Sequence, residues 1–163
     1  MQPYTEAYLD IETTGLSPTF GEIAVVGIHI SNGADTRFVQ LVGGDITTAN
    51  ILEALKGVNT IYTYNGSRFD LPFIFRRLGT DLAGLFRHCD LMYHCWQNNL
   101  YGGLKSVERQ LNIPRQLRDI DCYQAVKLWW QYVNDYGEAA LATLLEYNKE
   151  DVINLKSLKE RLL

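Results

Sequence analysis

The chain has 163 residues, of which 47% are hydrophobic and 21% charged, a balance typical of folded domains that excludes disordered and fibrous architectures. No apolar run approaches the roughly 18 to 20 residues of a membrane-spanning helix, and residues 1–6 lack the basic start and apolar stretch of a signal peptide. The net charge of −4 counts against a nucleic-acid partner, because binding phosphate groups requires Lys and Arg side chains.

Five short strands are predicted from apolar and β-branched runs that end at turn residues. They cover residues 8–11, 23–30, 36–41, 60–64 and 89–92. The second run is almost continuously apolar, which is typical of a strand buried on both faces. Ser31, Asn32 and Gly33 follow it and predict a hairpin into the third strand.

Helical spacing of apolar residues predicts five helices. They cover residues 47–56, 69–78, 104–111, 121–133 and 138–162. Thr48 is the expected N-cap of the first helix and Gly57 its stop, whereas Pro72 lies in the first turn of the second helix and Gly79 at its end. An early hairpin, later helical crossovers and a helical C-terminal third predict an α/β fold, with a mixed sheet covered by helices on both faces.

The first strand carries two carboxylates, Asp10 and Glu12. Side chains two apart on a strand point to the same face, roughly 6 to 7 Å apart. Two acids this close resist burial unless a cation lies between them. The pair is therefore a candidate metal site, although two solvated acids at the end of a strand would show the same pattern.

A third acid, Asp70, follows the fourth strand within the segment 64–70 and opens a helix. This position lies near the carboxyl edge of the sheet, where open α/β sheets place their sites. The alternative is a helix start at which Asp70 only favours the positive end of the helix dipole.

A fourth acid, Asp151, shares a face of the last helix with Tyr147. Both lie along one flank of the apolar stripe of that helix, where a packed face can meet a cleft. A Tyr-x-x-x-Asp pair alone carries little information.

In order and spacing, Asp-x-Glu, Asn-x-x-x-Phe-Asp and Tyr-x-x-x-Asp resemble the three motifs of the DEDD exonuclease family, which has a ribonuclease H-like fold and includes DnaQ-like proofreading exonucleases. The segment 10–16 is similar to the first motif almost letter for letter. Tyr147 matches the tyrosine subclass, because the histidine subclass would need histidine where Glu146 stands. The resemblance spans residues 9–151 and implies a single ribonuclease H-like exonuclease domain, residues 1–163, with a five-stranded mixed sheet.

The resemblance implies two divalent cations, Mg²⁺ or Mn²⁺, and stepwise hydrolysis from a 3′ end that releases nucleoside 5′-monophosphates. Hard oxygen ligands suit both ions, and two ions about 3.5 to 4 Å apart stabilise the attacking and leaving oxygens. By motif, Asp10 bridges both ions, and Glu12 and Asp151 complete the site that binds the attacking water. Asp70 holds the second ion through water, and Tyr147 orients the nucleophilic water.

The same resemblance implies the substrate contacts. Thr13 and Thr14 would donate hydrogen bonds to the terminal nucleotide, and Leu16 would wedge against its base. Asn65 and Phe69 would contact sugar and base. A plain turn at 13–16 and a core position for Phe69 are the alternatives.

Three further features remain open. Lys105 follows a glycine pair at the start of a helix and is a candidate phosphate contact, unless it belongs to an ordinary solvated helix. The aromatic side chains of the helix at 121–133 are candidates for base stacking or core packing: Trp129, Trp130 and Tyr132. Two His-Cys pairs invite a zinc interpretation that their place beside a buried strand disfavours: His88–Cys89 and His94–Cys95.

Charge and cysteine content complete the expectations. Residues 68–127 carry nine basic and six acidic residues, whereas the rest carries six basic and thirteen acidic. The acidity therefore weakens a nucleic-acid interpretation without excluding it, since bound cations would offset part of it. Three cysteines without a Cys-x-x-Cys pair favour a reducing cytoplasm. The alternatives to an exonuclease are a structure-specific endonuclease on the same fold and a non-catalytic subunit that binds nucleic acid or a helicase.

Overall fold

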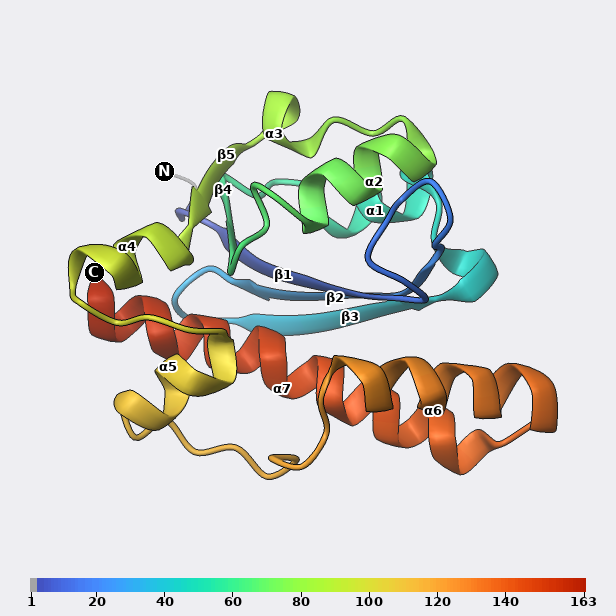
Figure 1. The fold of residues 1–163 in the computed structure, drawn as a ribbon. Helices are drawn as coiled ribbons and strands as arrows, with labels where there is room; N and C mark the ends of the chain where they lie inside the picture. The colour runs from blue at the N-terminus through green and yellow to red at the C-terminus, as the bar shows by residue number, and fades with distance from the viewer. Residues whose placement is uncertain (1–2) are drawn as a thin grey trace.

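In the computed structural model, which describes residues 3–163, five strands form one mixed sheet in the order β3-β2-β1-β4-β5 (Figure 1). Neighbouring strands β1, β2 and β3 pair antiparallel, whereas β1–β4 and β4–β5 pair parallel. The strands are β1 (Glu6–Thr13), β2 (Ile23–Ser31), β3 (Thr36–Val42), β4 (Thr60–Thr63) and β5 (Arg87–Asp90). The first two residues of the segment expected to lack a signal peptide lie outside the described residues.

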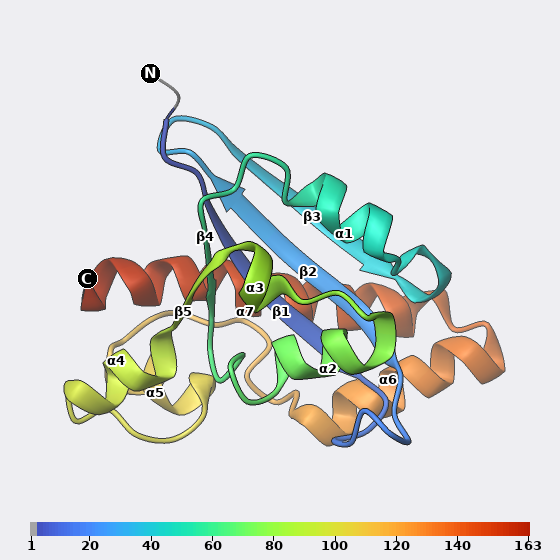
Figure 2. The ribbon, with the colours of Figure 1, turned by 90° about the horizontal axis from the view of Figure 1, so that it is seen from above.

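Helices cover both faces of the sheet. Figure 1 and Figure 2 show α1 and α2 on one face and the long α7 crossing the other, with α5 and α6 packed beside α7. The helices are α1 (Thr48–Ala54), α2 (Asp70–Leu78), α3 (Leu82–Leu85), α4 (Leu91–Gln97), α5 (Leu104–Gln110), α6 (Cys122–Asp135) and α7 (Glu138–Leu162), with a 3₁₀ turn η1 (Gly43–Asp45). No helix within residues 3–163 combines the length and apolar character needed to span a bilayer. The predicted α/β fold, with its mixed sheet and helical C-terminal third, is confirmed.

Alternation along β1 decides which side chains face which helices. Leu9 and Ile11 are buried in the cluster shared with α1 and α2, whereas Tyr8 is buried in the cluster shared with α7. Because successive side chains of a strand point to opposite faces, Asp10 and Glu12 lie on the α7 face. The register pairs Asp10 with Gly27 and shifts between Glu12 and Thr13, so the regular ladder of β1 ends where the acidic pair ends.

The sheet opens between β1 and β4 at its carboxyl edge. Their parallel pairing extends only as far as Tyr8 and Tyr62, although β1 continues to Thr13. Beyond this point no strand of residues 3–163 pairs with that edge of β1, and the start of α2 reaches it instead. Parallel strands that diverge in this way form the crevice in which open α/β sheets place their sites.

Two local predictions were wrong in detail. The N-cap of α1 is Thr47 rather than Thr48, because the Thr47 side chain accepts a hydrogen bond from the Asn50 amide. The fifth strand ends at Asp90, whose carboxylate caps α4 by accepting from the Met92 amide. Residues 91 and 92 are therefore helical, and the short helices α3 and α4 were not predicted.

Candidate active site

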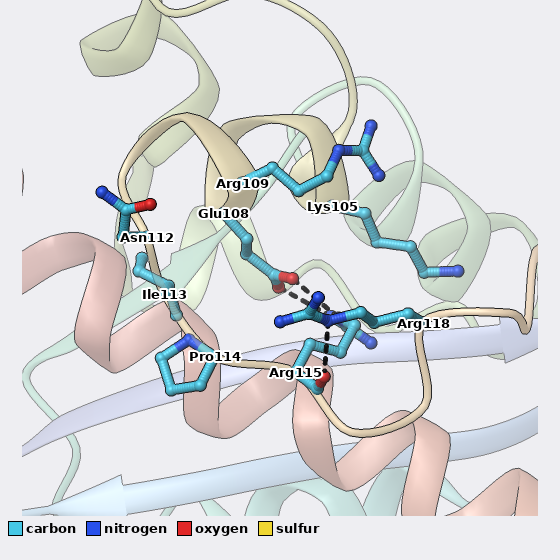
Figure 3. Close-up of a pocket in the computed structure, with 8 residues that line it drawn as sticks. All are labelled: Lys105, Glu108, Arg109, Asn112, Ile113, Pro114, Arg115 and Arg118. Carbon is cyan, nitrogen blue, oxygen red and sulfur yellow. Dashed lines mark hydrogen bonds and ion pairs between the residues drawn. The ribbon is translucent and has the colours of Figure 1, made fainter.

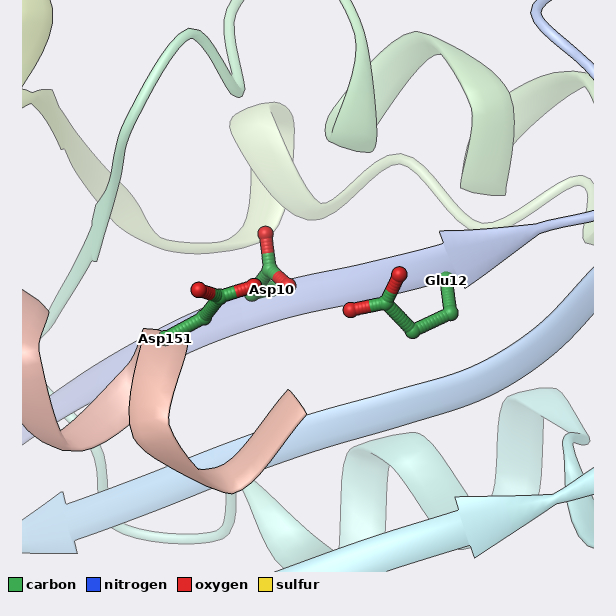
Figure 4. Close-up of side chains that lie close together, drawn as sticks. All are labelled: Asp10, Glu12 and Asp151. Atoms are coloured by element: carbon green, nitrogen blue, oxygen red, sulfur yellow. The ribbon is translucent and has the colours of Figure 1, made fainter. Parts of the chain in front are cut away.

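Three carboxylates converge where β1 passes α7. One oxygen from each of Asp10, Glu12 and Asp151 lies within 4.8 Å of the others (Figure 4). The first two come from β1 and the third from α7, 139 positions further along the chain. The structure thus brings together three of the four acids that the sequence singled out.

A glycine and an asparagine allow this approach, and neither was predicted. Asn148 is fully buried on α7 and donates through Nδ2 to the backbone oxygen of Asp10 at 3.2 Å. Its Oδ1 accepts from Gln40 on β3 at 3.0 Å. A Cβ on Gly27 would lie 2.1 Å from that Oδ1, so only glycine leaves room for the asparagine. A glycine inside an apolar strand is the sequence signal for such a close approach.

The electrostatics of the cluster favour a cation. Burial raises the pKa of Asp10 well above its ordinary value, and the charges of Asp151 and Glu12 raise it further. Burial and the charge of Asp151 likewise raise the pKa of Glu12. The Glu12 Oε1 atom is buried and lacks a hydrogen-bond partner among the described residues. An oxygen without a donor, within an all-oxygen set of repelling acids, fits a hard divalent cation.

One cation of the protein already contacts this cluster. The Arg115 Nη2 atom lies 2.5 Å from Asp151 Oδ1, and the same guanidinium donates to both carboxylate oxygens of Glu108 at 2.7 Å. Arg115 and Glu108 are 6% and 2% exposed. Burial raises the pKa of Asp151, and Arg115 opposes that rise. Nothing in the sequence marks Arg115, which lies in an irregular segment, as a partner of Asp151.

Asp70 lies beside the cluster but outside the group of three. It begins α2, is 3% exposed, and its Oδ2 accepts from the backbone amide of Ile11 at 3.0 Å. Asp70 therefore contacts the edge of β1 beyond the point where the pairing with β4 ends. Burial raises the pKa of Asp70 to about 7, although the Ile11 hydrogen bond works against the shift.

Tyr147 faces the same site one turn before Asp151. It lines a hollow of about 250 Å³ together with Asp10, Lys105 and Asp151. Burial and the nearby carboxylates raise its pKa, so the hydroxyl stays protonated at neutral pH and can donate a hydrogen bond. Lys105 is half-buried, with its Nζ 4.6 Å from the centre of the Tyr147 ring.

A larger, mostly apolar pocket of about 480 Å³ lies on the Glu12 side of the cluster. The residues that line it come from the end of β1, the following loop, Phe69 and α6: Ile11, Glu12, Thr13, Thr14, Gly15, Leu16, Phe69, Cys122, Tyr123, Val126 and Lys127. The contribution of α6 was not predicted, since nothing in its sequence points to β1.

The predicted contact residues in the loop after β1 have distinct environments. The Thr13 hydroxyl donates to the Gly15 oxygen at 2.7 Å, and Thr14 Oγ1 accepts from the Glu22 amide at 2.9 Å. Both hydroxyls therefore hold the loop in shape. Leu16 is 79% exposed at its tip.

The predicted contact residues of the second motif are held by their surroundings. Phe69 packs on Phe73, with ring centres 5.5 Å apart, and also lines the apolar pocket. Asn65 has a left-handed backbone, with φ of 60°, and its backbone amide donates a hydrogen bond to the Asp90 carboxylate. The Asn65 Oδ1 atom is buried without a partner among the described residues.

The zinc interpretation finds no geometric basis in residues 3–163. Within these residues, the cluster whose side chains lie close enough to share one metal ion is the group of three carboxylates. It contains no histidine or cysteine. His88 instead shares a hydrogen bond with Thr63 at 2.8 Å, and Cys95 is buried in the core.

The fold and this site together define a nuclease-like α/β protein of the ribonuclease H type. Residues 7–163 match the model of the RNase_H superfamily, and the chain belongs to that superfamily. No curated protein matches the chain.

Solved structures share the fold. The family B DNA polymerase of the archaeon Pyrobaculum calidifontis has a TM-score of 0.75 at 17% identity, over 98% of this chain and 24% of the polymerase. A nuclease in its apo form has a TM-score of 0.64 at 21% identity, over 99% of this chain and 72% of the nuclease. Brucella melitensis NrnC with bound Mg²⁺ has a TM-score of 0.63 at 24% identity, over 99% of this chain and 73% of NrnC. A further structure shows NrnC bound to pGG. This chain thus spans about a quarter of the polymerase.

Proposed function

We propose that this protein is a metal-dependent 3′–5′ exonuclease of the tyrosine subclass of the DEDD family, with residues 1–163 as a single exonuclease domain. The proposed substrate is the 3′ end of single-stranded or frayed nucleic acid, and the products are nucleoside 5′-monophosphates. The observation that carries the proposal is the approach of three carboxylates to within 4.8 Å beside Tyr147. The Mg²⁺ and pGG found in NrnC, which has the same fold, support it.

The acids present fit two Mg²⁺ or Mn²⁺ ions. Asp10, Glu12 and Asp151 would hold them directly, and Asp70, which faces the same edge of β1, would act through water. Ions held there would supply Lewis acidity toward the scissile phosphate and its attacking water. The Asn148 bond to the Asp10 backbone fixes the strand that carries the first two ligands.

The remaining groups bind and orient the substrate. The protonated Tyr147 hydroxyl donates a hydrogen bond toward the attacking water, and its raised pKa keeps the proton on the oxygen. The apolar pocket beside Glu12 accepts the terminal base, with Leu16 and Phe69 against its faces and Tyr123 closing the α6 side. Thr13 and Thr14 keep the β1 loop in position, and Asn65 is the proposed contact to the sugar.

The direct test is degradation of 5′-labelled single-stranded DNA and RNA with Mg²⁺, Mn²⁺ or EDTA. A 3′–5′ exonuclease leaves a ladder of shortened labelled strands, whereas attack from the 5′ end releases labelled mononucleotide first. We expect Asp10→Asn and Asp151→Asn to abolish the ladder. The exposed turn residue Asp35 gives a matched control, since Asp35→Asn should act like the wild type. Full activity of Asp10→Asn would refute the site assignment.

A circular single-stranded substrate separates this activity from that of an endonuclease. It has no end, so an exonuclease leaves it intact under conditions that degrade the linear strand. Cleavage of the circle at a similar rate would refute the exonuclease proposal and favour the endonuclease.

A further inference from the structure

A second hollow lies between α5 and the irregular segment 112–118, and Arg115 is one of the residues that line it (Figure 3). Its volume is about 280 Å³. The residues that line it are Lys105, Glu108, Arg109, Asn112, Ile113, Pro114, Arg115 and Arg118. We call this hollow the basic pocket, because four of its eight lining residues carry positive charge.

The acid of the basic pocket is already paired with an arginine. Both carboxylate oxygens of Glu108 accept from Arg115 at 2.7 Å, and Asn154 on α7 donates to one of them at 3.2 Å. This buried ion pair forms a fixed floor. Among the described residues Glu108 forms its ion pair with Arg115 and none with Lys105, Arg109 or Arg118.

The cations of the pocket retain unused donors. Only 6% of the Arg115 surface is exposed, and its Nη1 atom has no hydrogen-bond partner among the described residues. Arg118 donates its Nε to the Arg115 backbone oxygen at 3.0 Å, which holds the Arg118 side chain across the pocket. Burial lowers the pKa of Lys105, and the neighbouring charge of Arg115 lowers it further. Gathered cations that repel one another and have free donors are suited to an anion.

We propose that the basic pocket binds one phosphate group of the nucleic-acid strand, other than the phosphate being hydrolysed. Guanidinium groups match phosphate oxygens with paired donors, and a lysine adds a point charge. The assignment of that phosphate to a nucleic-acid strand rests on the proposed function. Phosphate binding by the pocket does not.

Two side chains connect the pocket to the carboxylate cluster. Arg115 contacts Asp151 on one side and lines the pocket on the other. Lys105 lines both the basic pocket and the hollow that contains Asp10 and Tyr147. A nucleic-acid strand whose 3′ end lies at the carboxylates can therefore place a neighbouring phosphate in the basic pocket.

The first test measures phosphate binding without metal. Inorganic phosphate is titrated in EDTA and followed by calorimetry and ³¹P NMR, with wild type, the double variant Arg109→Gln/Arg118→Gln and the control Arg76→Gln. All three substituted arginines are exposed, and Arg76 lies on α2 across the sheet. We expect the double variant to bind at least about tenfold more weakly, as loss of charge-assisted hydrogen bonds implies, and Arg76→Gln to match the wild type. Equal binding by all three, or none by the wild type, would overturn the pocket.

The second test identifies the source of the phosphate. Binding of a short single strand in EDTA is compared with binding of strands in which one linkage is a neutral methylphosphonate. For the wild type, one linkage position should weaken binding about tenfold when neutralised, and the double variant should be insensitive there. The double variant should also show a salt dependence lower by about 0.7 in slope, the contribution of one phosphate contact to a single strand.

The outcomes separate the two proposals. Phosphate binding with no sensitive linkage would refute the strand assignment and leave a site for free phosphate or a mononucleotide. A sensitive linkage in a protein that hydrolyses nothing would uphold the basic pocket and refute only the exonuclease. Hydrolysis with no phosphate binding in EDTA would refute the pocket alone.

Discussion

Replacing Arg115 with methionine should destabilise the protein strongly. The change removes two 2.7 Å bonds to Glu108 and the 2.5 Å bond to Asp151, and leaves a Glu108 carboxylate that is 2% exposed. Breaking one side of a buried ion pair costs about 3 to 5 kcal/mol, because the remaining charge is buried without its partner. At about 2 to 4 °C per kcal/mol for a domain of this size, the melting temperature should fall by roughly 6 to 20 °C.

The design of the assay separates a lost ion pair from lost packing. Unfolding is measured by urea titration in EDTA for Arg115→Met and for Glu108→Leu/Arg115→Met, in which neither charge remains. Apolar residues of similar volume often replace a buried ion pair with little loss, so the double variant should recover more than half of the stability. Arg76→Met is the control for losing an exposed arginine.

Magnesium provides a second measurement of the same interaction. Without Arg115, Asp151 loses the one cation that it contacts among the described residues, so Mg²⁺ should stabilise Arg115→Met more than it stabilises the wild type. A single variant as stable as the wild type, or a double variant no more stable than the single one, would refute the assigned role of the ion pair.

Three further predictions concern residues around the cluster. Gly27→Ala should lower stability by about 1 to 3 kcal/mol and reduce hydrolysis, since its Cβ would overlap Asn148, and Gly44→Ala, with open space around it, is the control in denaturation and nuclease assays. Asp70→Asn should flatten the pH dependence of stability in EDTA. The folded pKa of Asp70, about 7, exceeds its ordinary value of 3.8, so the wild type binds more protons when folded and loses stability as pH rises between those values; an unchanged slope from pH 5 to 8 would contradict the shift. Tyr147→Phe should slow turnover while leaving Mg²⁺ affinity by calorimetry unchanged, and an undiminished rate would exclude its orientation of water.

Much of the fold follows from short-range patterns. The 8 to 25 residues of elements such as β1, β2 and α7 carry their own periodicity, so alternation and helical spacing locate them. The helix α3, of four residues, is too short to show a period, and the first two residues of α4 were assigned to the fifth strand instead. The two helices begin at the N-caps Asp81 and Asp90, which sequence alone does not distinguish from other loop acids.

The acidic pair shows the same limit within the site. Spacing alone places Asp10 and Glu12 on one face of a strand, and Tyr147 and Asp151 on one face of a helix, because those periods are properties of the backbone. It does not say which face meets which. That depends on Gly27, whose missing side chain lets α7 approach β1.

The sequence by itself determined the class of fold through local spacing, and it indicated the candidate ligands through the resemblance of its three motifs to those of a known family. The tertiary structure decided the rest: that Asp70 lies at the edge of β1 rather than within the group of three, that α6 closes the apolar pocket, and that Arg115 joins Asp151 to the basic pocket. These are contacts between segments dozens of residues apart. They follow from the complementary packing of whole elements, which no local period records.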